Sequence, residues 1–264
     1  MDAKPKLKVF GLFREAREVF ARRPFFCAGT WAVFTVFGQG TSLGEYGGSV
    51  VMLLILILLA SFSGAVRGGY DLTMLRLLRG EDGVVFRDLF QGFAKFWSLL
   101  GVQLSMGIAV GLVAAPTFIA LMFASELPGI AGQLLGGVLM SLAGFGAATL
   151  LIGLSMAFLL VMEDDLVTSD ALMDSWNLTG GHRWRIFLIF LVALSLEAVV
   201  FGLAGLAFTL LSALIATELP AIALGGIVFL FGSLVVGSIS QLALIGAYRA
   251  LRQHRDGEEV GAIA

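Results

Sequence analysis

The sequence has few of the side chains from which metal centres and covalent cross-links are built. It contains one cysteine, Cys27, and two histidines in 264 residues. A single cysteine forms no disulfide within the chain, and so few sulfur and imidazole ligands argue against a zinc site. We therefore expect no metal and no cofactor, and we expect Cys27 to be a small, buried, apolar residue.

Charged residues are also scarce. They make up 14% of the chain, whereas about a quarter of the residues of a soluble domain are charged. Hydrophobic residues reach 58%, and the mean hydropathy is +0.96. The 34 glycines suit helices that pack closely in a bilayer. This composition is typical of a polytopic membrane protein.

Recognisable catalytic motifs are missing as well. The sequence has neither a P-loop nor an HExxH motif. Its basic residues flank apolar segments, where they are better interpreted as phospholipid contacts than as a nucleic-acid surface. We therefore predict a protein that is not an enzyme and does not bind nucleic acid.

Six apolar segments are long enough to cross the hydrocarbon core, which takes about 20 helical residues. Together they predict an all-α membrane protein whose residues 1–264 form one membrane domain. An even number of spans places both termini on the same side. The predicted spans are 24–43, 49–69, 97–123, 133–162, 185–213 and 221–247.

The lysines and arginines are distributed unevenly between the connections. All 17 fall in residues 4–23, 67–95, 183–185 and 249–255, and the other three connections have none. Loops rich in Lys and Arg stay in the cytoplasm. We therefore predict a multi-pass protein of a bacterial inner membrane with both termini in the cytoplasm.

Parts of the sequence resemble one another. The predicted outside turns "ASELPGIA" (124–131) and "ATELPAIA" (216–223) nearly match. The hairpin ends "GGYDLTMLRLLRGED" (68–82) and "GAYRALRQHRDGEE" (246–259) match as well. These pairs predict a parallel internal repeat about an axis along the membrane normal, although hairpins of similar composition also resemble each other by chance. The predicted units are 7–82, 86–165 and 169–256.

Each predicted unit begins with an aromatic and basic segment. These segments are 13–26, 86–97 and 174–187. Apolar residues recur at helical spacing in the first unit, at Val9, Leu12, Phe13, Ala16, Val19 and Phe20. We predict an amphipathic helix at the membrane surface before each hairpin, the alternative being a helical continuation of the span itself. The expected interfacial anchors are Arg22, Arg23, Lys95, Trp97, Trp176, Arg183, Trp184 and Arg185.

The polar stretch 169–187 has two interpretations, an active-site loop or the third of these surface helices. Ser169 is a suitable N-cap, and Gly180 or Gly181 is a suitable helix end. We favour the surface helix, whose polarity would be that of the membrane interface.

Two segments carry a resemblance to a known group of proteins. They are "ALMDSWNLTGGHRWRIFLIFLV" (171–192) and "YDLTMLRLLRGEDGVVFRDLFQGF" (70–93). They resemble six-helix bacterial integral membrane proteins related to the membrane domain of glycerophosphodiester phosphodiesterases. The resemblance spans most of the chain at the level of pattern and implies the six-helix fold. The soluble catalytic barrel of those enzymes has no counterpart here, so their activity is not carried over.

Glu197 is the strongest candidate for a functional residue. It lies 13 residues beyond Trp184, about 20 Å along a helix that rises about 1.5 Å per residue. An ionisable group at that depth costs about 2.5–3.5 kcal/mol to insert. It is either a proton relay, cation relay or ligand-binding group, or a protonated carboxyl bonded to a neighbouring helix. Thr149 lies at a similar depth and is a possible partner.

Other residues in the spans predict packing. Gln103 and Gln241 are expected to hydrogen-bond between helices or to join Glu197 and Thr149 in an intramembrane polar site. Arg67 and Asp71 are four residues apart and predict an ion pair on one helix face. Small-residue stripes predict close helix packing, by default within the chain, at Gly107, Gly111, Gly202 and Gly205.

These features leave two main functions open. The first is a non-catalytic scaffold, assembly factor or accessory subunit that packs against other membrane protein subunits. The second is a transporter or lipid-handling protein with a cavity between the hairpins that uses Glu197. An intramembrane enzyme is the least favoured interpretation.

Overall fold

The computed structural model describes residues 8–39, 50–125, 130–214 and 218–263 of the 264-residue chain. Every regular element in these ranges is a helix and none is a strand, which confirms the all-α prediction. The helices are α1 (Val9–Arg22), α2 (Pro24–Gln39), α3 (Val50–Leu78), η2 (Phe86–Lys95), α4 (Phe96–Ser125), α5 (Ile130–Leu154), α6 (Ala157–Asp164), α7 (Thr168–Leu178), α8 (Arg183–Leu214) and α9 (Glu218–Ile263).

Four helical stretches among the described residues are long and apolar enough to cross a membrane. They are Phe86–Phe123, Gly132–Asp164, Arg183–Leu210 and Gly226–Asp256. They coincide with the last four predicted spans. The first predicted span, 24–43, corresponds to a shorter apolar helix, Pro24–Thr35, and ends outside the described residues. Residues 50–69 of the second, 49–69, lie within α3, and residue 49 is outside the described residues.

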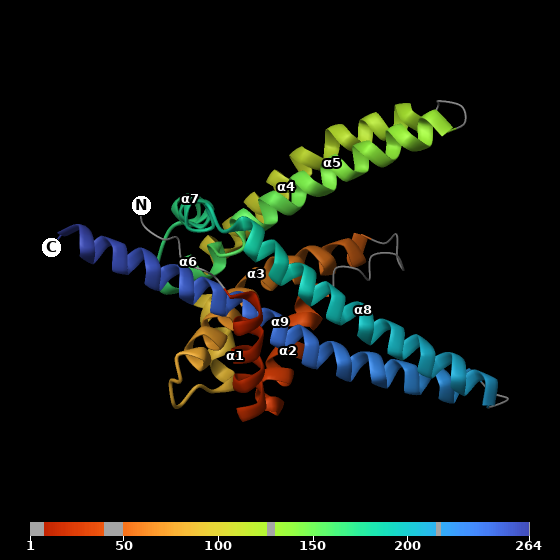
Figure 1. Cartoon of the computed structure of the whole chain (residues 1–264), viewed down its shortest axis with the longest axis horizontal. Helices are drawn as coiled ribbons and strands as arrows, with labels where there is room; N and C mark the ends of the chain where they lie inside the picture. The colour runs from red at the N-terminus through yellow and green to blue at the C-terminus, as the bar shows by residue number, and fades with distance from the viewer. Residues whose placement is uncertain (1–7, 40–49, 126–129, 215–217, 264) are drawn as a thin grey trace.

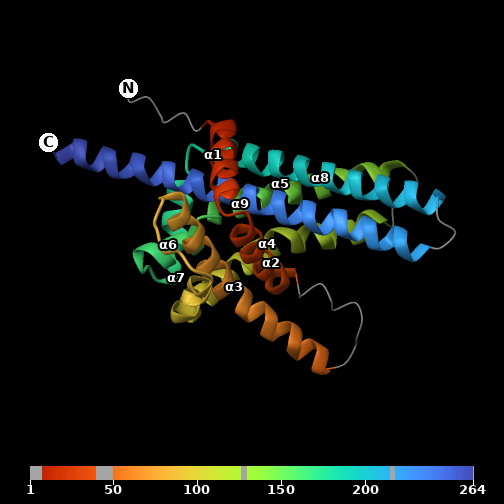
Figure 2. The same ribbon diagram turned by 90° about the horizontal axis from the view of Figure 1, so that it is seen from below.

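The long helices pack in antiparallel pairs. α4 runs along α5 and α8 runs along α9, and the two pairs leave a common base in different directions (Figure 1). We call them the α4–α5 arm and the α8–α9 arm. The C-terminal part of α9 continues past the beginning of α8 (Figure 2). α2 packs on α3 near the base.

The two arms expose large apolar side chains. Leu112 is 70% exposed, Phe118 68%, Leu142 65% and Leu203 55%. A helix that is apolar on all sides belongs in a protein core or in a bilayer. These side chains lie outside the core of the chain, and their exposure is compatible with helices embedded in a membrane.

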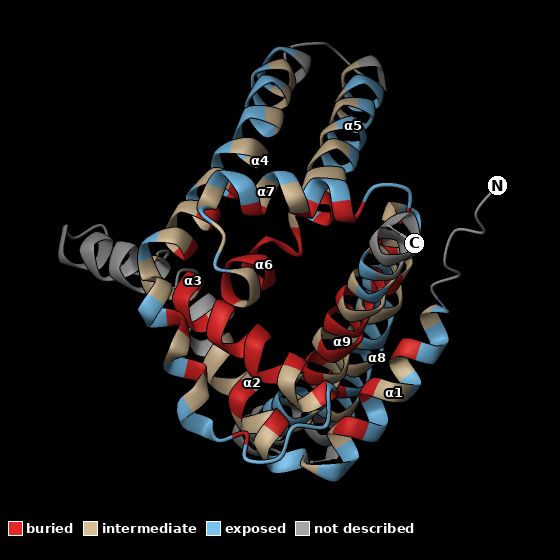
Figure 3. Ribbon diagram, turned by 90° about the vertical axis from the view of Figure 1, so that its left-hand side faces the viewer, coloured by how far each residue is buried: buried red, intermediate tan, exposed pale blue. Residues whose placement is uncertain are grey.

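The buried core lies at the base of the arms, as the buried segments in Figure 3 show. Tyr70 of α3, Phe158 of α6 and Tyr248 of α9 are among the largest fully buried side chains. α3 packs against both α6 and α9. The base is therefore built from the inner ends of helices that belong to different pairs.

Acidic residues at the end of α6 join these helices. Glu163 accepts hydrogen bonds from Arg79 and from the Tyr248 hydroxyl, the latter at 2.6 Å. Asp164 accepts two from Arg252, at 2.7 and 3.0 Å. Neither carboxylate is among the predicted site residues. The sequence does carry a sign of this contact. An acidic run follows the fourth apolar segment, and arginines follow the second and the sixth.

Three short helices each pack on the last helix of a hairpin, which for α7 is α6, the continuation of α5. α1 packs on α9, η2 packs on α3, and α7 packs on α6. α1 buries Leu12, Ala16 and Val19, while the Arg14 side chain is 78% exposed. The predicted amphipathic spacing is thus present in α1, but its apolar face contacts protein.

The start of α7 corrects one prediction about the polar stretch 169–187. α7 begins at Thr168 after Val167, so Ser169 lies within the first turn and is not the N-cap. The predicted end is right, because α7 stops at Leu178 and Gly181 follows with φ of 77°. A positive φ is readily adopted only by glycine.

α7 also stabilises the break in the helix between α5 and α6. The backbone N–H of Met156 donates to Ser175 Oγ at 3.2 Å, and Ser175 Oγ donates to the Gly153 carbonyl at 2.9 Å. The Thr179 hydroxyl also donates to the Gly153 carbonyl, at 3.2 Å. Backbone groups that lose their helical partners at a break must bond elsewhere when buried. α7 supplies those partners, and we call these contacts the α7 clasp.

Glycine packing differs from the prediction. At Gly107, Gly111, Gly202 and Gly205, a Cβ atom would meet no other atom within 4 Å. The default expectation that these stripes pack within the chain is therefore wrong for the described residues. The physical reason is that both stripes lie on the outer faces of the arms, whereas α4 contacts α5, and α8 contacts α9, through their other faces.

A close backbone contact occurs instead between α3 and η2. A Cβ on Gly69 would overlap the Leu89 carbonyl group, and a Cβ on Gly92 would overlap the Ala65 carbonyl group. Both positions are buried. Only glycine permits this approach of two backbones.

Candidate functional site

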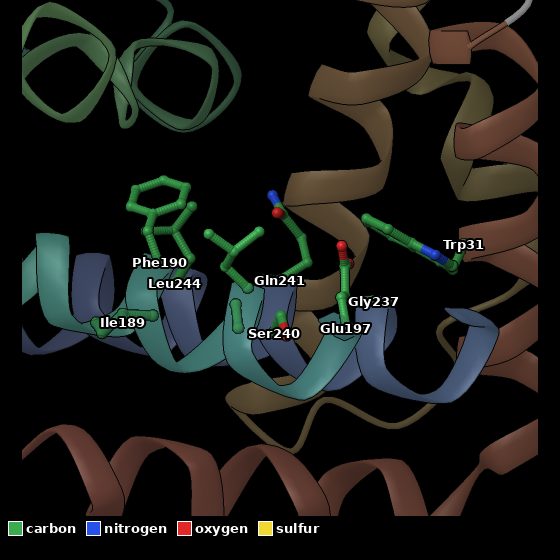
Figure 4. A pocket seen from close by; sticks show the side chains of 10 residues that line it. Trp31, Ile189, Phe190, Glu197, Gly237, Ser240, Gln241 and Leu244 are labelled. Atoms are coloured by element: carbon green, nitrogen blue, oxygen red, sulfur yellow. The ribbon is translucent and has the colours of Figure 1, made fainter. Parts of the chain in front are cut away.

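Glu197 and Gln241, two of the four residues predicted to form a polar site, lie together. They line a cavity of about 230 Å³ with Trp31 and Ser240, between α8, α9 and α2. The carboxylate of Glu197 points to the same side of the α8–α9 pair as the amide of Gln241 (Figure 4). The remaining lining residues are apolar or glycine: Ile189, Phe190, Ala193, Leu194, Gly237 and Leu244.

Gly237 explains how α2 reaches this cavity. A Cβ on Gly237 would overlap the Trp31 ring. The indole therefore sits against bare α9 backbone, where it also contacts the rings of Phe34 and Tyr70. Glycine at this position lets α2 approach α9 and brings an aromatic wall to the cavity.

The Glu197 carboxylate has neither a hydrogen bond nor an ion pair with any described residue. Ser240 Oγ is buried and likewise has no partner among them. Unpartnered polar groups on an apolar helix pair are unfavourable unless water or a ligand reaches them. These two groups are therefore available to a molecule that enters the cavity.

A line of polar contacts leads from the cavity into the base. Gln241 Nε2 donates to Asp71 Oδ1 at 2.8 Å. Asp71 is buried and lies 3.8 Å from Arg67 Nε, which confirms the predicted pair. The Arg67 guanidinium stacks over Phe158, 4.5 Å from the ring centroid. Gln241 thus connects the cavity to a buried ion pair.

Burial dominates the electrostatics of Asp71, which lies beyond the predicted span 49–69. Loss of hydration raises the pKa of this carboxyl to about 6, although Arg67 and the Gln241 amide both favour its charged form. Desolvation disfavours a carboxylate whenever its partners replace water incompletely. The Asp71 carboxyl is therefore harder to ionise than that of an exposed aspartate.

The other two predicted polar residues lie elsewhere. The Thr149 hydroxyl donates to the Phe145 carbonyl of its own helix at 2.8 Å, so it is not the partner of Glu197. Depth along a helix does not determine the side to which a residue points. Thr149 of α5 points to the beginning of α8 and not to Glu197. Gln103 bonds with Ser63 of α3 at 2.8 Å, which is the interhelical contact predicted for it.

The predicted interfacial anchors divide into exposed and internal residues. Arg22 is exposed, Trp97 is 79% exposed and Trp184 is 68% exposed, as expected for residues at a membrane surface. Lys95, in contrast, donates to the carbonyls of Val161 and Met162 at the end of α6. Arg23 donates to the Val84 carbonyl. The internal residues help to hold the base together.

Trp176 and Arg183 pair with each other at the surface of the base. Trp176 packs against Gly153, where a Cβ would overlap its ring. The Arg183 guanidinium stacks on the same indole, 3.6 Å from its centroid. Arg185 is half-buried and contacts other residues. The polar stretch 169–187 is therefore largely a structural element, which favours the surface-helix interpretation over an active-site loop.

Comparison of the chain with protein-family models, with curated proteins and with solved structures found no match.

Proposed function

We propose that the chain is a multi-pass membrane protein with six spans arranged as three parallel hairpins, with both termini in the cytoplasm of a bacterium. The helix pairs α2–α3, α4–α5 and α8–α9 support three hairpins. The matching contacts of α1, η2 and α7, each on the helix that ends a pair, support the repeat. The charge distribution supports the orientation, because every Lys and Arg falls on one predicted side.

Within that membrane, the chain is proposed to act as a non-catalytic scaffold or accessory subunit of a larger complex. The observation that carries this proposal is the outer glycine face of each arm. A Cβ atom added at any of these glycines would meet no atom of another described residue within 4 Å. They are Gly107 and Gly111 on α4, and Gly202 and Gly205 on α8. Only 6% of the most apolar window of Phe86–Phe123 is buried within the chain. In a bilayer, such faces are where helices of two proteins approach closely.

A paired variant tests the scaffold. Replacing both Gly107 and Gly111 with leucine should weaken the binding of a stoichiometric membrane partner about tenfold. A loss of about 1.4 kcal/mol of packing energy corresponds to that change in affinity. The thermal midpoint of the isolated chain should stay unchanged, because neither glycine packs within it. The measurement is quantitative mass spectrometry of the complex after extraction in a mild detergent.

The control for this variant is Leu112→Phe, which enlarges a side chain that is 70% exposed and lies about 100° around the same helix. It should leave the partner bound. A chain that is extracted as a clean monomer under the mildest conditions would contradict the scaffold.

A second candidate function is the handling of a proton or a small cation at Glu197. The specific observation is the unpartnered carboxylate on the cavity with Ser240 and Gln241. Intramembrane ionisable residues commonly mark ion or proton pathways. Gln241 and Asp71 would continue such a pathway towards the base.

Glu197→Gln separates this candidate from the scaffold. In vesicles that carry the protein and a potassium diffusion potential, an internal pH dye should report proton entry with the wild-type chain and none above empty vesicles with Glu197→Gln. Ser195→Ala is the matched control, because Ser195 is exposed on the same helix and its hydroxyl bonds, among the described residues, only to the Leu191 carbonyl. Wild-type flux no greater than that of empty vesicles, or equal flux in the Glu197 variant, removes the proton pathway.

A further inference from the structure

A second cavity lies between the two arms, near their base. It measures about 270 Å³ and is lined by Phe145, Ala148, Thr149 and Ile152 of α5 and by Arg183, Trp184 and Phe187 of α8. The Thr149 hydroxyl is bonded to its own helix. Apart from Arg183, the walls therefore offer apolar contacts to an occupant.

Arg183 brings a fixed positive charge to this cavity. Its guanidinium stacks on Trp176, and its Nη2 donates to the Trp176 carbonyl at 3.3 Å. Stacking of this kind preorganises an arginine to bind an anion. Arg183 forms no ion pair with any described residue, and its buried Nε–H has no acceptor there.

The start of α8 adds to this charge. α8 begins at Arg183 and has no acidic residue in its first turn. The amide groups at a helix N-terminus favour an anion. The amides of Arg185 and Ile186 already donate to the His182 carbonyl, so at this end the amides of Arg183 and Trp184 are the ones that an anion could use. Trp184 is stacked with Phe187, at a ring-centroid distance of 5.2 Å, and is 68% exposed. Exposed tryptophans next to basic residues are typical of the headgroup level of a membrane.

We propose that this cavity binds one anionic phospholipid. Its phosphate contacts the Arg183 guanidinium and the backbone amides of Arg183 and Trp184, and one acyl chain lies against Phe145, Ala148, Ile152 and Phe187. The apolar walls favour a lipid over free phosphate, because inorganic phosphate would leave them uncovered. The charge favours an anionic headgroup over a zwitterionic one. The proposal requires only that the chain lies in a membrane, and it stands or falls independently of the scaffold.

The experiment is a lipid titration of the purified full-length chain followed by native mass spectrometry. Phosphatidylglycerol should bind about fivefold more tightly than phosphatidylcholine with the same acyl chains. Arg183→Gln should abolish that preference. Arg185→Gln is the matched control, since it removes one positive charge two residues away on a side chain that does not line the cavity.

A second variant tests the acyl-chain half of the site and keeps Arg183. Ala148→Phe fills the apolar end of the cavity and should weaken phosphatidylglycerol binding even if Arg183→Gln fails to fold. Equal binding of the two lipids by the wild-type chain would overturn the proposal, as would a preference that survives both variants. Displacement of the lipid by glycerol phosphate at equal concentration would assign the site to a free phosphate compound. It would overturn the proposal that the occupant is a phospholipid.

Discussion

Gly92→Leu should prevent the chain from folding, whereas Gly111→Leu should leave the fold intact. Gly92 faces the Ala65 carbonyl so closely that even a methyl group would overlap it, and Gly69 faces the Leu89 carbonyl in the same way. Both obstacles are backbone atoms, so no rotamer change relieves the clash. Overpacking costs about 1–3 kcal/mol where side chains can adjust, and more where they cannot. We expect Gly92→Ala to destabilise the protein by at least about 3 kcal/mol, a large part of the roughly 5–15 kcal/mol by which a typical domain is stable.

The measurement is the thermal unfolding midpoint in detergent, together with the fraction of protein that elutes without aggregating. Gly111→Ala is the matched control for Gly92→Ala. It lies on a helix of the same chain with open space around its Cβ position, and alanine has the higher helix propensity. Its midpoint should stay the same or rise. Equal losses for Gly92→Ala and Gly111→Ala would show that the α3–η2 contact is not a rigid backbone crossing.

This contrast explains part of what the sequence could predict. The four later apolar segments follow from their length and hydropathy, and the helix at Val9–Arg22 follows from its helical periodicity. Both are local properties of the sequence. The glycine stripes were selected by spacing along one helix, which reports which residues share a face. Spacing does not report whether another helix covers that face. Gly69 and Gly92 lie on two different segments, and no periodicity links them.

The candidate site shows the same limit. Glu197 and Gln241 were identified from their depth in apolar segments, and both line one cavity. Thr149 was chosen by the same depth argument and faces elsewhere. Depth fixes one coordinate of a residue, and the direction in which its helix faces fixes the others. That direction is set by long-range packing between segments.

Asp71 adds a second kind of limit. The i,i+4 spacing of Arg67 and Asp71 predicts their ion pair, and the pair is present. Nothing in the local sequence indicates that Asp71 is buried or that Gln241, 170 residues away, donates to it. Burial raises the pKa of Asp71 and the Gln241 amide opposes that rise, so both effects come from packing between distant segments.

The α7 clasp is the second place where one substitution should have a large effect. Ser175 Oγ is the acceptor for the Met156 N–H and a donor to the Gly153 carbonyl, and its side chain is buried. Ser175→Ala leaves the Met156 amide without a partner, and a buried unpaired amide costs about 1–3 kcal/mol. Adding Thr179→Val removes the other donor to the Gly153 carbonyl. The double variant should lose more than Ser175→Ala alone, and the losses should not add, because both hydroxyls share one acceptor.

The comparison for Ser175→Ala is Ser141→Ala, whose hydroxyl is exposed and bonds only to the Gly137 carbonyl of its own helix. That change should stay within about 0.5 kcal/mol of the wild type. Hydrogen exchange adds a local readout, since loss of the clasp should speed exchange around residues 153–157 before it affects the tips of the arms. If Ser175→Ala matched Ser141→Ala in both stability and exchange, water would be replacing the hydroxyl at the break. The polar stretch 169–187 would then be a surface helix that only rests on α6.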